Sequence, residues 1–174
     1  MTEAARCRVE ARAGAALRAI LETLNPRSQR DRVLRAYWLA QFQLVCRGGD
    51  LIRGKKLPAA RSWDPLRETH RGRALFEPAV DETGRVCGVR LSLTLKPSKA
   101  DPEGLKDIVK TGIIDNTPGA LSAAAAIADM LEHAGEVAGA LPEAISLFLD
   151  PTTGEELTYA YAAIQLRSRL IRSG

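Results

Sequence analysis

A basic segment from position 47 to position 73 carries the side chains best suited to holding an anion. Cations hold phosphates by charge, and an aromatic ring among them can stack on a base. Two further arginines fall in the first turn of a predicted helix, where they oppose the helix dipole and favour an anion nearby. The pattern therefore predicts a surface for nucleic acid or another polyanion. Its candidate residues are Arg47, Arg53, Lys55, Lys56, Arg61, Trp63, Arg67, Arg71, Arg73, Arg27 and Arg30.

The same segment has a competing interpretation. It shows little periodicity, and connections longer than about 12 to 15 residues without regular structure are usually functional or disordered. A single tryptophan is more often an anchor on the core than a stacking platform. A solvated loop with Trp63 packed inward would therefore produce the same sequence.

Within the basic segment, the sequence GDLIRGKK from Gly49 to Lys56 resembles a phosphate-binding loop in its spacing of Gly and Lys. Lys56, however, stands where that motif needs a Ser or Thr to bind magnesium. A phosphate loop also connects a strand to the N-terminus of a helix. Here a predicted helix precedes the motif and Leu57-Pro58 follows it, so we assign no nucleotide site.

The histidines and cysteines form no metal or catalytic motif in the sequence. His70 and His133 stand 63 positions apart, with no Cys or acid at ligand spacing. Either could act as a general base only if the fold placed it beside a suitable partner. The cysteines, Cys7, Cys46 and Cys87, are scattered and odd in number, which indicates reduced thiols. We therefore predict no metal, no cofactor and no catalytic residue, and expect Cys46 and Cys87 to be buried as small hydrophobes.

Charge is divided between the two halves of the chain. Residues 1–75 hold 14 Arg and 2 Lys against 7 acidic residues, a net charge of +9. Residues 76–174 hold 5 Arg and 4 Lys against 14 acidic residues, a net charge of −5. A basic half suits phosphates or an acidic partner, and it equally suits two halves that attract each other within the fold or between copies. The excess of arginine suits phosphate forks, but it is also the bias that a GC-rich genome produces.

Residues 74–96 predict a β-hairpin around which the other elements are organised. Every second residue from Cys87 to Leu95 is apolar, which is the period of a half-buried strand. Asp81 begins and Gly84 ends a turn of the kind that joins hairpin strands. One face of the hairpin is therefore expected to be covered by helices.

Four helices are predicted from apolar residues at helical spacing and from capping residues and prolines at their starts. The second of them is apolar nearly all round in its second half, which indicates burial. The fourth contains four consecutive alanines, which let another element approach closely. The predicted ranges are 4–24, 26–46, 102–111 and 118–134.

The C-terminal region has two interpretations. We prefer a strand through about Leu149 followed by a helix, because Thr153 and Glu156 form a capping box before an apolar stripe. The alternative is a second hairpin, in which residues 155–172 begin as a strand.

Together these elements predict an α+β fold, with a small antiparallel sheet centred on the hairpin at about 74–96 and helices packed mainly on one side. The length suits a single domain over residues 1–174, with a basic helical half (1–75) and an acidic α+β half (76–174). No apolar run is long enough to cross a bilayer, and the first residues lack the pattern of a signal peptide. We therefore expect no membrane partner and a cytoplasmic location.

Three functions are compatible with this sequence. The first is a non-enzymatic binding protein that contacts nucleic acid, DNA or RNA, or another polyanion through its Arg-rich half and residues 47–73. The alternative is a scaffold or regulatory module for protein interaction, because a small sheet leaves edges that favour a homodimer or a larger assembly. The third is an enzyme whose site the sequence does not reveal.

Overall fold

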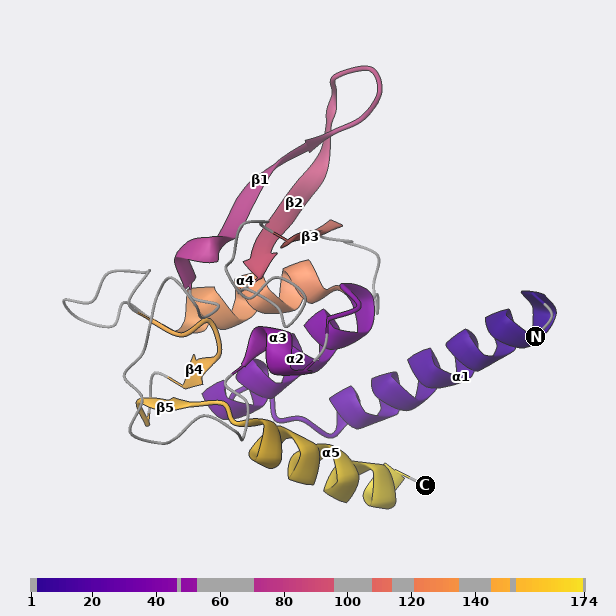
Figure 1. Cartoon of the computed structure of the whole chain (residues 1–174), viewed down its shortest axis with the longest axis vertical. Helices are drawn as coiled ribbons and strands as arrows, with labels where there is room; N and C mark the ends of the chain where they lie inside the picture. Colours follow the sequence, from indigo (N-terminus) through magenta and orange to yellow (C-terminus); the bar gives the residue numbers. More distant parts are fainter. Residues whose placement is uncertain are drawn as a thin grey trace.

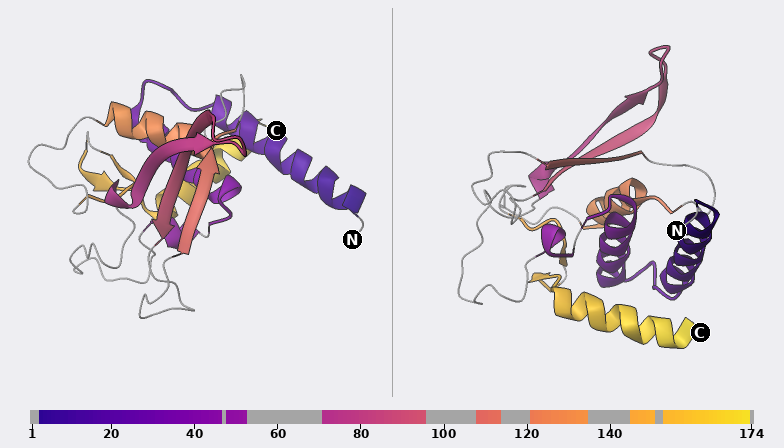
Figure 2. Two further views of the ribbon diagram at one scale, coloured as in Figure 1. Left: turned by 90° about the horizontal axis from the view of Figure 1, so that it is seen from above. Right: turned by 45° about the vertical axis from the view of Figure 1, so that its right-hand side comes forward.

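A three-stranded antiparallel sheet lies over a layer of helices (Figure 1 and Figure 2). The structure is a computed structural model of the chain. Helices gather on one side of the sheet, with the C-terminal helix furthest from it. The predicted α+β class is therefore confirmed. The described ranges are 3–46, 48–52, 71–95, 108–113, 121–134, 145–150 and 153–173.

The first two predicted helices are confirmed, each slightly shorter than expected. Helix α1 spans Glu3–Glu22 and helix α2 spans Gln29–Gln43. Helix α2 begins three residues after the expected Pro26 because the Ser28 hydroxyl caps it, accepting a hydrogen bond from the Asp31 amide at 3.3 Å. A capped start satisfies one of the free amides of the first turn, so the helix begins where the cap is available.

The sheet is a meander of three strands. The short helix η1 (Arg71–Arg73) leads into β1 (Ala74–Val80), which pairs with β2 (Val86–Leu95). Strand β2 pairs in turn with β3 (Ile108–Ile113). Strands β1 and β2 confirm the predicted hairpin, and Gly84 in their turn has a φ of 81°, which glycine adopts without strain.

Strand β3 occupies part of a predicted helix. The prediction of a helix over 102–111 is wrong from 108 to 111, where the chain is extended and pairs with β2. Most residues of β3 are β-branched, and their stiff side chains favour a strand. Pairing with the hairpin therefore outweighs a short helical pattern. Residues 102–107 and 118–120, also predicted as helix, lie outside the described part of the chain.

Helix α4 spans Ala123–His133 and packs against α2 on one side and β3 on the other. It begins later than the predicted range because Ser122 caps it, accepting from the Ala125 amide at 3.1 Å. The Gln43 side chain, at the end of α2, accepts a further hydrogen bond from the Ala123 amide. Ala123, Ala124 and Ala126 of α4 are buried, as their small size leads one to expect where elements pack closely.

The C-terminal region combines both predicted interpretations. Strands β4 (Leu149–Asp150) and β5 (Glu155–Glu156), each two residues long, pair as an antiparallel hairpin. Helix α5 (Tyr159–Ser173) follows. The preferred strand through about Leu149 is found only as Leu149–Asp150. The preferred helix is confirmed, but it does not begin at the capping box of Thr153. Thr158 caps it instead, because its hydroxyl accepts a hydrogen bond from the amide three residues later at 3.2 Å.

Helix α2 forms the centre of the core, which confirms the predicted burial of its second half as far as Ala40; Phe42 and Val45, further on, are exposed. Leu34 and Leu39 are fully buried. Tyr37 meets Phe148 edge-on, with ring centroids 5.6 Å apart and ring planes at 80°, an arrangement that aromatic pairs favour. Leu91 completes this core from the sheet. A short helical turn, α3 (Gly48–Leu51), also packs here.

Replacing Asp31 with alanine should lower the free energy of unfolding by about 1–3 kcal/mol, because the carboxylate serves several donors that would lose their acceptor. It accepts from the Asn25 amide at 2.8 Å and lies 3.3 Å from the Arg169 guanidinium, so it joins α5 to the turn before α2. Urea denaturation measures the change. Glu22→Ala, on the exposed surface at the end of α1, is the control, and an equal loss in both variants would contradict this role.

Candidate functional site

Most of the predicted anion-binding residues lie outside the part of the chain that the structure describes. Four predicted residues are described: Arg27, Arg30, Arg71 and Arg73. The predicted residues outside the described ranges are Arg47, Arg53, Lys55, Lys56, Arg61, Trp63 and Arg67.

Two of the four described arginines, Arg30 and Arg73, use their guanidinium groups in contacts within the fold. Arg27 is exposed. Arg30 forms an ion pair with Glu155 at 3.4 Å and lies 4.1 Å above the centre of the Tyr161 ring. Arg73 donates to the carbonyl oxygen of Leu95 at 3.2 Å. Part of the positive charge predicted for an anion is thus used within the fold.

Arg71 is also drawn into the fold, at the base of the hairpin. Its Nε and Nη2 atoms are buried and have no hydrogen-bond partner among the described residues. Burial lowers the pKa of Arg71, because desolvation disfavours its charged form. A half-buried guanidinium of this kind is a poor contact for a nucleic acid that approaches from solvent.

The basic and acidic halves attract each other across the interface of α2 with later elements. Arg32 on α2 lies 2.6 Å from Asp129 on α4, and Arg30 pairs with Glu155. These pairs match one of the two uses expected for the divided charge, attraction within the fold.

The hairpin extends beyond the helices as an arm (Figure 1), which we define as residues 76–89. At the base of the hairpin, Leu91 and Leu93 are fully buried. Further out, Val89 is 38% exposed and Val86 is 63% exposed. The expectation that helices cover one whole face of the hairpin is therefore right for its base and wrong for the arm.

The exposed apolar residues of the arm share the face that is buried at its base. In the register, Phe76 lies opposite Leu91, and Val80 lies opposite Val86. Cross-strand partners point to the same side of a sheet, so this side of the arm continues the side that covers the core. We call the exposed set the arm stripe. It comprises Phe76, Pro78, Val80, Val86 and Val89, all of them exposed or nearly so.

The opposite face of the arm differs in character. Glu77 and Arg90 lie opposite each other there, so the charges of the strands are directed away from the arm stripe. The register shifts near Ala79, where the extra residue is Cys87. The thiol of Cys87 is exposed and Cys46 is buried. The expected burial of both cysteines is therefore confirmed for Cys46 and wrong for Cys87.

At the tip of the arm, Asp81 organises the turn. One of its carboxylate oxygens accepts from the Thr83 hydroxyl at 2.6 Å, the Thr83 amide at 2.9 Å and the Arg85 amide at 3.0 Å. The hydrogen bond from the Thr83 side chain, followed by those from the two amides, lowers the pKa of Asp81 because all of them favour the charged form. The tip therefore keeps its negative charge in weakly acidic solution.

The turn should lose its order only in strong acid. Because the pKa of Asp81 is lower in the folded turn than in the unfolded chain, its stabilising effect is present above the unfolded value and is lost as the pH falls through the lowered folded value. An NMR titration should show the Thr83 and Arg85 amides shifting with a midpoint below the ordinary value of 3.8. Asp81→Asn should abolish this titration. A midpoint above 3.8 would contradict the assignment.

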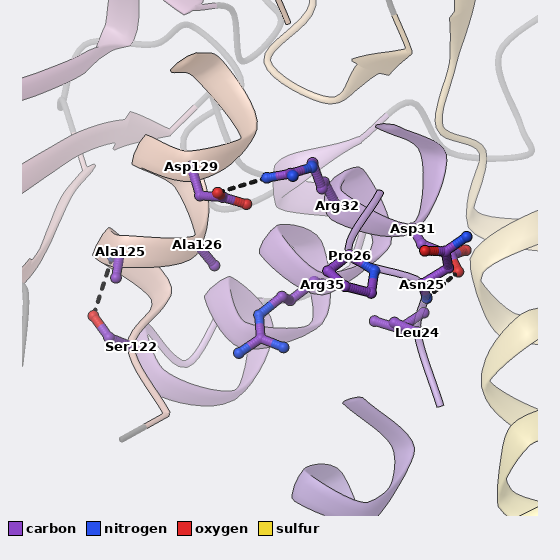
Figure 3. Close-up of a pocket in the computed structure, with 10 residues that line it drawn as sticks. All are labelled: Leu24, Asn25, Pro26, Asp31, Arg32, Arg35, Ser122, Ala125, Ala126 and Asp129. Carbon is purple, nitrogen blue, oxygen red and sulfur yellow. Dashed lines mark hydrogen bonds and ion pairs between the residues drawn. The ribbon is translucent and has the colours of Figure 1, made fainter. Parts of the chain in front are cut away.

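A cavity of about 440 Å³ opens between the turn after α1, helix α2 and helix α4 (Figure 3). Both apolar and charged side chains face it. No local sequence pattern predicts this cavity, because its walls come from segments about 90 positions apart. Only the packing of α4 on α2 brings these segments together. Its lining residues are Leu24, Asn25, Pro26, Asp31, Arg32, Arg35, Ser122, Ala125, Ala126 and Asp129.

Most charges in this cavity are already paired. Arg32 lies 2.6 Å from Asp129, and Arg169 of α5 lies 3.3 Å from Asp31. Arg35 makes no hydrogen bond or ion pair within the described ranges. In Figure 3 its guanidinium points into the gap beside α4, away from both carboxylates.

Comparison with known proteins assigns no family to this chain: no family model matches it, and neither a curated protein nor a solved structure shows significant similarity. None of the helices in the described ranges is long and apolar enough to span a membrane. Within the same ranges, no group of three or more His, Cys, Asp or Glu side chains is placed to hold a metal ion. Function must therefore be argued from the arm and the cavity.

Proposed function

We propose that this protein is a non-enzymatic interaction module that pairs with a second copy of itself through the arm stripe. One observation carries the proposal. The face of the hairpin that covers the core continues outward along the arm as an apolar surface that becomes more exposed, from 38% at Val89 to 63% at Val86, and Val80, 51% exposed, is at its far end.

An arm of this kind gains stability from a partner. A two-stranded hairpin alone is only marginally stable in water, because it lacks a third strand or a helix to cover its apolar face. Contiguous exposed apolar residues mark sites of protein interaction. Phe76 and the three valines of the stripe are large side chains that are 37–63% exposed. Burying the exposed part of each contributes a fraction of the about 1.5–3 kcal/mol that full burial of such a side chain supplies.

A second copy of the chain suits the arm stripe because the stripe contains no charge, so two stripes can pack face to face without burying one. In a two-fold arrangement, with the two arms running in opposite directions, each copy presents the same apolar surface to the other.

Pairing through the faces is also favoured over pairing through the edge of the sheet. Strand β1 is an outer strand, and Pro78 lies in its middle. Proline has no amide hydrogen to donate, so it interrupts the ladder that an added strand would form. The apolar face remains the part of the arm that a second copy can cover.

Sedimentation velocity over a range of protein concentrations tests this proposal. We expect a single boundary that moves from the monomer to the dimer as the concentration rises, and an association that persists in high salt because most of the contact is apolar. A protein that remains monomeric at the highest concentration would contradict pairing with a second copy, and would leave a different protein as the occupant of the arm.

A second function, binding of nucleic acid or another polyanion by the basic half, is favoured by one observation. Residues 1–75 carry a net charge of +9, and the described ion pairs engage only a part of it. Titration of labelled duplex and single-stranded DNA and RNA at several salt concentrations tests this function, and affinity should fall steeply with salt. Lys55→Glu with Lys56→Glu should weaken binding more than Arg30→Gln. No binding at low salt would contradict it.

A further inference from the structure

We propose that the cavity between α2 and α4 binds a small carboxylate with an apolar body, and that Arg35 holds its carboxylate group. This site is separate from the arm, and the proposal does not depend on self-association. It follows from the charges that line the cavity, from its apolar walls and from its size.

Arg35 supplies an uncompensated positive charge in the wall of the cavity. The two lining carboxylates each have a cation: Asp31 has Arg169, and Asp129 has Arg32 at 2.6 Å. Asp129 is also 3.4 Å from the His133 ring. Arg35 has no such partner in the described part of the chain, although it is only partly exposed. Arg35, as the one unpaired cation among these four charged lining residues, can therefore balance the single negative charge of a bound carboxylate.

The geometry of Arg35 suits a carboxylate. A guanidinium is a planar fork that can donate two parallel hydrogen bonds to the two oxygens of a carboxylate. Figure 3 shows this fork pointing away from Asp31 and Asp129, so neither lining carboxylate occupies it. A phosphate dianion fits less well, because it would bring a second negative charge close to Asp31 and Asp129, whose own cations are already engaged.

The other lining residues suit an apolar body. Leu24 and Pro26 form one wall, and Ala125 and Ala126 form the opposite wall on α4. The volume, about 440 Å³, lies within the range of cavities that hold small molecules. A chain or ring of several carbons can therefore lie between the alanines and the turn while its carboxylate meets Arg35.

Isothermal titration calorimetry with acetate, hexanoate, phenylacetate, hexanol and inorganic phosphate, at constant ionic strength, tests the proposal. Hexanoate and phenylacetate should bind at least about tenfold more tightly than acetate, because only they fill the apolar walls. Hexanol, which lacks the charge, should bind at least about tenfold more weakly than hexanoate. Phosphate should bind more weakly than either long carboxylate.

Four variants, one of them a control, test whether binding takes place in the cavity. Arg35→Gln should weaken hexanoate binding by about tenfold or more, and Arg35→Lys should weaken it less, because it keeps the charge without the fork. Arg27→Gln is the matched control. Arg27 lies in the connection between α1 and α2, where it is exposed, and it does not line the cavity. Ala125→Leu should narrow the cavity and weaken hexanoate without affecting acetate. Circular dichroism confirms that each variant is folded.

The outcomes separate the possibilities. Absence of binding by every carboxylate would overturn the proposal. Equal loss in the Arg27 and Arg35 variants would also overturn it, because it would indicate general attraction to a basic protein. Tighter binding of phosphate than of hexanoate would overturn the carboxylate class. If Arg35→Gln does not fold, the difference between hexanoate and acetate in Ala125→Leu still decides whether the cavity is the site.

Discussion

Replacing Val80 with lysine should convert the dimer into a monomer while leaving the fold intact. Val80 is 51% exposed at the outer end of the arm stripe, so a lysine there has room in the monomer. In the dimer it would place a charge in the apolar contact, away from water. The substitution occurs twice in a symmetric dimer, so the dissociation constant should rise by about 100-fold or more, or about 3 kcal/mol.

Leu75→Lys provides the matched control. Leu75 lies in the same strand and is 54% exposed, but it belongs to the other face of the hairpin, opposite Ser92. Sedimentation velocity should give the same association for Leu75→Lys as for the unaltered protein. Equal weakening by both substitutions, or an unaffected dimer in Val80→Lys, would contradict the assignment of the contact to the arm stripe.

Replacing Leu91 with alanine should lower the free energy of unfolding by about 2–5 kcal/mol, the usual cost of a large-to-small change in a core. Leu91 is fully buried between the sheet and the helices. Val89, two residues further out on the same face, is 38% exposed. Val89→Ala should therefore cost less than Leu91→Ala in the monomer, because Val89 keeps part of its surface in water and its truncation leaves no closed cavity.

The two variants should be compared by urea denaturation in the Val80→Lys background, which keeps every sample monomeric. In this way the measured difference reports on folding and not on association. A much larger loss of unfolding free energy in Leu91→Ala than in Val89→Ala would place the end of the core between these two residues. Similar costs would mean that the arm is covered in the monomer, which would contradict the basis of the proposed interface.

The elements that the sequence predicts well are those with strong local signals. The hairpin follows from strict alternation and from a turn that begins at Asp81 and ends at Gly84, and both are found. The first two helices follow from apolar stripes. Their starts are less predictable, because several residues near a helix start can act as its cap. Ser28, Ser122 and Thr158 are the caps in this fold, and the pattern pointed to other positions.

The incorrect predictions concern contacts between distant parts of the chain. Residues 108–111 have a helical pattern, but β2 offers a partner strand, and no local signal reveals that partner. The exposure of Cys87 was missed for the same reason. Alternation shows that a strand has an apolar face, and it cannot show how far along the strand the covering helices extend.

The two candidate sites also differ in how far the sequence predicts them. The residues of the arm stripe lie inside the predicted hairpin, so the sequence identifies them but not their exposure. Arg35 could not be singled out among the 14 arginines of residues 1–75, because its role depends on which neighbours are paired. Arg30 shows the converse, since its predicted role in anion binding competes with the contacts it makes to Glu155 and Tyr161.

The most direct test of self-pairing through the arm is an isotope-filtered NOE measurement on dimers mixed from ¹³C-labelled and unlabelled chains. Arms packed face to face in opposite directions should give contacts between the Val80 methyl groups of one copy and the Phe76 ring of the other. The account would be contradicted if a dimeric sample gave no contacts between the arms of the two copies. Contacts between copies at Ile164 and Ile171 on α5 instead would also contradict it.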